Sequence, residues 1–120
     1  MDEVEIVELK EEYCSQVAEI EKKTFSLPWS EKAFLECMEH PDRHYFCAVC
    51  KEEVLGYCGY WGVLDEAEIY NVAVKEESRG RGIGSLLLTK LIDYGKIDNR
   101  KRFLLEVRCG NKAAISLYKK

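Results

Sequence analysis

The sequence lacks the features that mark disordered, membrane-spanning and secreted proteins. Only two of its 120 residues are proline, and no stretch is of low complexity. Runs without a charged residue, such as 46–50 and 55–64, fall well short of the roughly 20 apolar residues that a transmembrane helix needs. The first five residues are largely acidic, unlike a secretory signal peptide. We therefore expect a globular protein of the cytoplasm with no membrane partner.

An excess of basic residues is also missing. The formal net charge is −4, whereas a protein that neutralises nucleic-acid phosphates needs a basic face. The sequence therefore argues against direct nucleic-acid binding and is compatible with a basic peptide as partner. With 120 residues, of which 47% are hydrophobic, the chain can bury one core but not two. We expect residues 1–120 to form a single domain.

Six cysteines are present, but their context does not favour disulfides or metal. A disulfide framework needs an oxidising, secreted setting, which the N-terminus does not indicate. Cys47 and Cys50 have the spacing of a zinc or redox site, with His40 and His44 upstream as possible ligands. Their segment reads as a strand, however, in which residues three apart point to opposite faces. We favour free buried thiols over a zinc site and expect no metal.

Hydrophobic periodicity predicts alternating strands and helices. A strand is expected over 4–9, a helix over 11–24, and a second helix that Ser30 caps and that ends near Pro41. Three antiparallel strands follow over 45–50, 54–63 and 67–74. A further helix is expected to bury Ile83, Leu86, Leu87, Leu91 and Ile92. A fifth strand over 103–107 and a fourth helix from 113 complete an α/β (α+β) domain.

The most informative segment is a glycine-rich turn between a predicted strand and a predicted helix. Glycines at 80, 82 and 84 leave room for backbone N–H groups to approach an oxyanion, and the helix dipole adds a favourable field. Arg79 and Arg81 add positive charge at the same place. The pattern favours a pyrophosphate ligand. The alternative is that the glycines only make a tight connection.

Two common phosphate-binding motifs fit this segment poorly. No G-x-x-x-x-G-K-[ST] occurs, which excludes a P-loop. A Rossmann fingerprint is nearly matched by Gly80, Gly82 and Ser85, and Glu106 lies at a tolerable distance for a ribose contact. Few residues follow Glu106, however, and the preceding strands have an antiparallel pattern. A doubly wound parallel sheet is therefore not expected.

The pattern R-x-x-G-x-G at 79–84, after the strand N-V-A-V at 71–74 and before a leucine-rich helix, resembles the pyrophosphate-binding signature of the GNAT superfamily of acetyl-CoA-dependent N-acetyltransferases. The segment F-S-L-P-W-S at 25–30 looks like the substrate-side loop of its RimI type, which acetylates the N-terminal alanine of a ribosomal protein. Residues 105–118 look like the catalytic segment of the same type. The resemblance covers nearly the whole chain.

The resemblance implies a GNAT fold: a mixed, mostly antiparallel sheet flanked by helices and splayed between its fourth and fifth strands. Acetyl-CoA would lie in that opening, with its pantetheine arm on the strand backbone and its pyrophosphate on the amides of the turn. The implied cofactor-binding residues are Val72, Ala73, Val74, Arg79, Gly80, Arg81, Gly82, Ile83, Gly84, Ser85 and Asn111.

The resemblance also assigns catalytic and acceptor residues. Glu106 would be the general base and Tyr118 the general acid, while Phe25, Pro28 and Trp29 would contact the substrate. Seven residues separate Asn111 from Tyr118, which places both on one side of a helix. The alternatives are a solvated Glu106 paired with Arg108, a core role for Tyr118, and core roles for Phe25 and Trp29.

The expected reaction is acetyl transfer to the N-terminal α-amine of a protein, with the alanine of a ribosomal small-subunit protein as the implied partner. Other acceptors, a small amine or a lysine side chain, stay open. The family's sheet continues with two more strands after the tyrosine-bearing helix, and we expect these last two strands to be absent from the 120 residues. An inactive acyl-CoA-binding module is therefore a further alternative. The sequence carries no signal for an oligomeric state.

Overall fold

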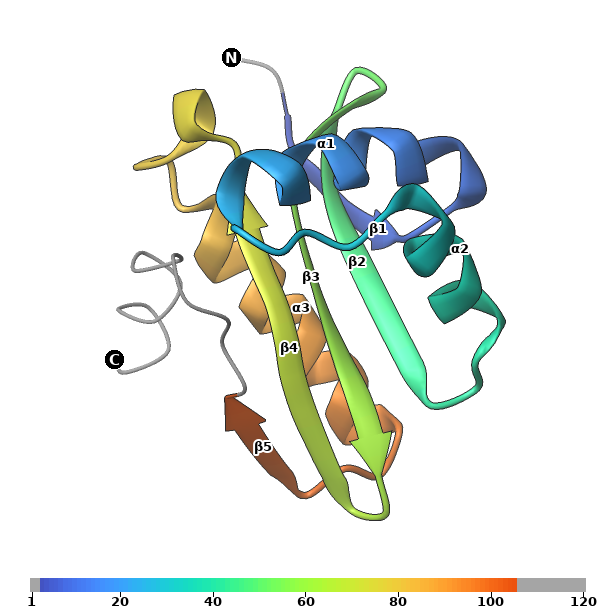
Figure 1. Ribbon diagram of the computed structural model, residues 1–120. Helices are drawn as coiled ribbons and strands as arrows, with labels where there is room; N and C mark the ends of the chain where they lie inside the picture. The colour runs from blue at the N-terminus through green and yellow to red at the C-terminus, as the bar shows by residue number, and fades with distance from the viewer. Residues whose placement is uncertain (1–2, 106–120) are drawn as a thin grey trace.

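The computed structural model describes residues 3–105, and these form one five-stranded sheet with helices on both faces (Figure 1). The elements are β1 (Glu5–Glu8), η1 (Glu11–Tyr13), α1 (Cys14–Thr24), α2 (Glu31–Glu39), β2 (Arg43–Cys50), β3 (Glu53–Val63), β4 (Glu66–Val74), η2 (Glu76–Ser78), α3 (Ile83–Ile97) and β5 (Arg102–Leu105). The strand order is β1-β2-β3-β4-β5, antiparallel except for the parallel pair β4 and β5. The predicted mixed, mostly antiparallel sheet flanked by helices is confirmed.

Alternation along the strands divides the core into two layers. On β2, Tyr45 and Cys47 pack in the layer under α1 and α2, whereas Phe46 and Ala48 pack in the layer under α3. Figure 1 shows α1 and α2 in front of the sheet and α3 behind it. Among residues 3–105 no helix is long and apolar enough to cross a membrane.

The first three predicted helices lie where the sequence pattern places them, with two differences, whereas the fourth, expected from residue 113, lies outside the described residues. The first begins as a 3-10 turn, η1, and Lys10 before it makes no side-chain cap hydrogen bond. In α3, Leu86 is 47% exposed and Leu88 is buried in its place. Leu86 lies five residues before the buried Leu91, which is about 140° around the helix, so the two cannot share one stripe. The prediction of a buried Leu86 was therefore wrong.

Ser30 caps α2 as predicted. Its Oγ accepts a hydrogen bond from the Ala33 N–H at 3.2 Å. We expect Ser30→Ala to lower the free energy of unfolding by about 1 kcal/mol, since the N–H loses its acceptor. Urea denaturation measures the change, and Ser26→Ala, at an exposed position before the helix, is the control. Equal losses in the two variants would contradict the capping role.

A polar cluster joins the end of α3 to the sheet. Asp98 Oδ2 accepts hydrogen bonds from Tyr60 Oη at 2.8 Å and Arg100 Nε at 2.9 Å. Burial disfavours the Asp98 carboxylate, but these two bonds and the Arg100 charge outweigh it and lower the pKa of Asp98 below its ordinary value. The ionised form therefore stabilises the folded chain above the unfolded pKa, and this stabilisation is lost as pH falls through the folded pKa.

We expect Asp98→Asn to lower the free energy of unfolding by about 1 kcal/mol at pH 7, since one charge-assisted acceptor is lost. The difference from the unaltered chain should shrink as pH is lowered below about 4, where the aspartate becomes protonated in the unfolded chain. Denaturation curves at several pH values check this. Asp93→Asn, exposed on α3, is the control, and a pH-independent difference would contradict the role of the Asp98 charge.

Candidate functional site

The connection from β4 to α3 folds as the glycine pattern predicts. Gly80 and Gly82 have φ of +80° and +78°, the left-handed region that favours glycine. Gly82 is the N-cap of α3, which begins at Ile83 without a side-chain cap. Arg79 Nε donates to the Val74 carbonyl at 3.0 Å and fixes the start of the turn to the end of β4. The chain therefore turns from the end of β4 into α3 within residues 75–82.

The start of α3 offers backbone N–H groups to a ligand. The first four N–H groups of an α-helix have no acceptor within the helix, and Leu86 is the residue whose N–H closes the first turn, on the Gly82 carbonyl at 3.1 Å. A Cβ at Gly80 or Gly82 would meet no protein atom within 4 Å. Open space, unpaired donors and the positive end of the helix dipole suit a diphosphate.

The sheet opens next to this turn. β4 pairs with β5 from Glu66 to Ile69, opposite Arg102 to Leu105. Within residues 3–105 no strand lies beside the second half of β4 on that side, and β5 leans away from β4 in Figure 1. Val72 and Ala73 are buried there and Val74 is half-buried. The outward backbone groups of 72–74 are thus placed to bond an extended ligand arm.

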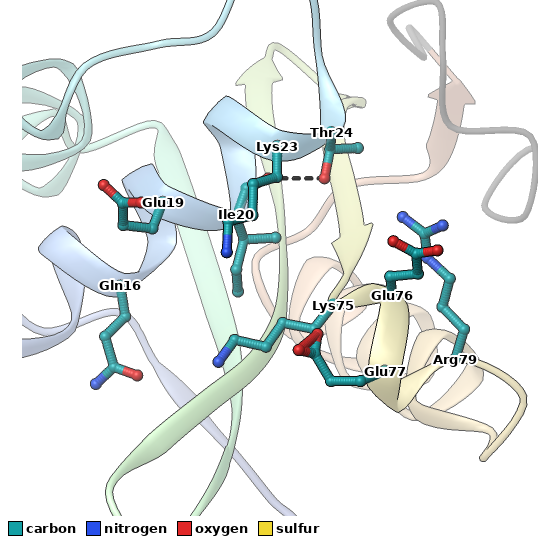
Figure 2. A pocket seen from close by; sticks show the side chains of 9 residues that line it. All are labelled: Gln16, Glu19, Ile20, Lys23, Thr24, Lys75, Glu76, Glu77 and Arg79. Atoms are coloured by element: carbon teal, nitrogen blue, oxygen red, sulfur yellow. Dashed lines mark hydrogen bonds between the residues drawn. The ribbon is translucent and has the colours of Figure 1, made fainter.

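A pocket of about 770 Å³ lies between α1 and the connection that follows β4 (Figure 2). Charges of both signs line it, and Lys75 is paired with Glu53 at 2.8 Å. The lining residues are Gln16, Glu19, Ile20, Lys23, Thr24, Lys75, Glu76, Glu77 and Arg79. Only Arg79 was predicted as a site residue. The α1 residues belong to no motif, so the sequence held no signal for them.

The three predicted acceptor residues lie in different environments. Phe25 is 5% exposed and part of the core, Pro28 is exposed, and Trp29 is half-buried. The Trp29 ring packs on Phe34 at 5.5 Å and on Trp61 at 5.8 Å between centroids. The loop therefore carries one anchoring ring inside the core and presents Pro28 and part of Trp29 to the outside. Glu106, Asn111 and Tyr118 lie outside the described residues.

A buried polar cluster under this loop was missed by the sequence analysis. Glu21 and Asn71 are both 0% exposed. Glu21 accepts hydrogen bonds from the Tyr57 hydroxyl, from Asn71 Nδ2 at 3.3 Å and from the Trp29 N–H at 2.9 Å. The one signal in the sequence is that Glu21 follows Val17 by four residues and so falls on the buried stripe of α1.

The C-x-x-C spacing on β2 does not bring its cysteines together. Cys47 packs in the layer under α1 and α2, and Cys50 packs in the layer under α3. Burial raises the pKa of the Cys47 thiol to about 12. No group of three or more possible metal ligands occurs in the part of the chain that the structure describes.

The structure thus combines a strand, a left-handed glycine turn and an uncapped helix beside an opening in a mixed sheet. These are the features that the resemblance to the GNAT superfamily implies. The sequence model of the acetyltransferase (GNAT) family matches residues 11–120. The chain belongs to the acetyltransferase (GNAT) family.

Several proteins that are similar to this chain carry names that state an N-acetyltransferase activity. A Bacillus subtilis (strain 168) protein named "putative ribosomal protein bS18-alanine N-acetyltransferase" is 39% identical over 110 residues, covering 91% of this chain and 73% of that protein. The crystal structure of the ribosomal-protein-S18-alanine N-acetyltransferase from Escherichia coli superposes with a TM-score of 0.82 at 31% identity, covering 98% of this chain and 75% of the other. The PaiA N-acetyltransferase of Thermoplasma acidophilum, solved in complex with coenzyme A, shares the fold, with a TM-score of 0.83 at 19% identity, covering 98% of this chain and 87% of the other.

Proposed function

We propose that this chain transfers the acetyl group of acetyl-CoA to the N-terminal α-amine of a protein, the alanine of ribosomal small-subunit protein bS18. The observation that carries the donor half is the left-handed glycine turn at the start of α3, next to the open half of β4. The acceptor half rests on the 39% and 31% identical relatives, whose names state alanine N-acetylation of this ribosomal protein. We place the reaction in the cytoplasm and treat residues 1–120 as one domain.

At the donor end, the backbone does most of the binding. The outward N–H and C=O groups of Val72, Ala73 and Val74 would bond the pantetheine arm. The amides of residues 80–85 would hold the pyrophosphate, and Arg81, which is exposed on the turn, would add charge. Arg79 is already bonded to the Val74 carbonyl, so its role would be to keep the turn against β4 and present its remaining N–H groups outward. Acetyl-CoA supplies an activated thioester.

At the acceptor end, the chemistry requires one base and one acid. An α-amine has a reference pKa near 7.7–8.0, whereas a lysine near 10.4 would cost roughly 3.5 kcal/mol more to deprotonate. One carboxylate therefore suffices for an N-terminal amine. Glu106 would take the amine proton and Tyr118 would protonate the departing thiolate, with Asn111 on the cofactor. These three assignments come from the family resemblance.

The function is tested by titrating the purified chain with acetyl-CoA in a calorimeter and then following a basic, alanine-starting peptide by mass spectrometry. We expect saturable binding and the gain of one acetyl group on the peptide α-amine. A polyamine and a peptide with a blocked N-terminus and an internal lysine are the comparison acceptors. Faster transfer to either would assign a different acceptor, and binding without transfer to any of them would contradict the enzymatic function.

The left-handed turn gives a separate prediction for donor binding. We expect Gly82→Val to weaken acetyl-CoA binding on the order of tenfold, because a β-branched residue at φ of +78° drives the turn out of the binding conformation. Gly82→Asn is the matched variant, since asparagine tolerates this region, and it should retain most of the affinity. Equal Kd values for the three chains in calorimetry would contradict a role for the turn.

A further inference from the structure

Glu21 is a buried carboxylate with partners on three different segments. One oxygen, Oε1, accepts from the Tyr57 hydroxyl of β3 and from Asn71 Nδ2 of β4 at 3.3 Å. The other, Oε2, accepts from the Trp29 N–H at 2.9 Å. A carboxylate with no exposed surface is costly unless it is fully hydrogen-bonded. An apolar residue at this position would avoid that cost but would make none of these hydrogen bonds.

The Trp29 end of this network fixes a loop. Residues 25–30 join α1 to α2 and belong to neither a helix nor a strand. Backbone bonds hold the two ends of this loop, at the Phe25 N–H and the Ser30 carbonyl. The Trp29 N–H is a backbone group, and its bond to Oε2 fixes the path of the main chain itself. Pro28, one of the exposed residues of this loop, directly precedes that anchor.

The Asn71 end fixes the strand that faces the sheet opening. The pairing of β3 with β4 shifts register between Gly59 and Tyr60, so that β4 carries an extra residue just before Asn71. Asn71 Oδ1 accepts from the Tyr45 hydroxyl at 2.6 Å, and that hydroxyl accepts from Trp61 Nε1 at 3.1 Å. Because Asn71 is hydrogen-bonded to both Glu21 and Tyr45, it fixes the backbone position from which residues 72–74 continue.

We propose that Glu21 is a positioning residue that holds the 25–30 loop in place relative to β4. Its two oxygens form a continuous link from the Trp29 N–H to the Asn71 amide. This inference rests on the proposed function, in which the loop meets the acceptor peptide and residues 72–74 meet the acetyl donor. Glu21 is itself fully buried, so it acts through these neighbours. The distance between amine and thioester thus depends on one side chain that touches neither.

The test is Glu21→Gln, which keeps the shape but offers one acceptor oxygen instead of two. Whichever way the amide turns, either the Trp29 N–H or the Asn71 amide loses its hydrogen bond to residue 21, so the link is cut. We expect kcat/KM for the alanine-starting peptide to fall on the order of 10- to 100-fold, mainly through KM, because the acceptor is misplaced. The Kd for acetyl-CoA should stay within about twofold.

Tyr57→Phe is the matched variant. It removes a hydrogen bond from the same Oε1 but leaves the link from Trp29 to Asn71 intact. A purely structural Glu21 predicts equal effects of the two variants on the peptide kcat/KM. The proposal predicts that both variants lose a similar amount of Tm. Only Tyr57→Phe should keep the peptide KM of the unaltered chain. Equal peptide KM values in the two variants would overturn it. Glu39→Gln, exposed at the end of α2, controls for the lost charge.

Hydrogen exchange separates this inference from the proposed function. The Trp29 amide should be protected in the unaltered chain and in Tyr57→Phe, and should exchange at least about tenfold faster in Glu21→Gln. Absence of peptide acetylation by the unaltered chain would refute the acceptor assignment, while the exchange rates would still decide whether Glu21 holds the loop. Should Glu21→Gln not fold, an unprotected Trp29 amide in the unaltered chain would overturn the inference.

Discussion

Glu106→Gln is expected to slow acetyl transfer on the order of 100-fold or more, because in the proposed function Glu106 is the base that takes the amine proton. Acetyl-CoA binding should be unchanged, since the proposed donor contacts lie on residues 72–74 and 80–85. Single-turnover kinetics with the alanine-starting peptide, beside calorimetric titration with acetyl-CoA, measures the two effects separately. Tyr118→Phe should show the same separation, through loss of the proton for the departing thiolate.

The control for this prediction is Arg108→Gln. A Glu106 that served only as the partner of an arginine on the strand would make the two substitutions equivalent, with small effects on rate. The catalytic role makes them differ by about two orders of magnitude in kcat. A Glu106→Gln chain that transfers acetyl at nearly the original rate would exclude this glutamate as the base.

Phe34→Ala is expected to have the largest effect on stability. The Phe34 side chain is 0% exposed, and its ring lies against those of Trp29, Tyr45 and Tyr57 at centroid distances of 5.5, 5.9 and 5.7 Å. Removing it leaves a cavity at the junction of α2, the 25–30 loop and the sheet. The free energy of unfolding should fall by about 3–5 kcal/mol. Urea denaturation followed by tryptophan fluorescence measures this.

Phe34→Leu distinguishes packing from a more general disturbance of the helix. Leucine fills most of the volume and should cost less than half as much. The emission of Trp29, which packs directly on the Phe34 ring, should shift in Phe34→Ala before any unfolding. Equal losses of stability in the two variants would show that the site does not depend on the volume of the ring.

Short-range patterns explain why the sheet was predictable from the sequence. Runs of aromatic and β-branched residues between polar breaks predicted the three central strands, 45–50, 54–63 and 67–74, within two residues of the observed ends. Ser30 marked the start of α2 because its cap uses atoms only three residues apart. The glycine turn was predictable for the same reason, since the left-handed φ at 80 and 82 is a property of single residues.

Contacts between distant residues could not be predicted in this way. Glu21 and Asn71 are fifty positions apart in the chain, and no periodicity signals that a carboxylate on one and an amide on the other will meet. The extra residue of β4 shifts the register of its neighbours, yet it leaves no mark in composition. The pocket beside Arg79 likewise draws half its lining from α1. The roles of Glu106 and Tyr118 stay predictions from resemblance.

In the proposed function, the glycine turn contacts the acetyl donor through main-chain N–H groups and not through side chains. A side chain at Gly80 or Gly82 would find empty space around it, so the neighbouring protein does not constrain what lies in front of the turn. Donor recognition would then depend on the shape of the backbone more than on the side chains around it. The acceptor loop at 25–30, by contrast, is built from large rings and one exposed proline. Changes there can retune the acceptor without altering the half of the enzyme that carries the acetyl group.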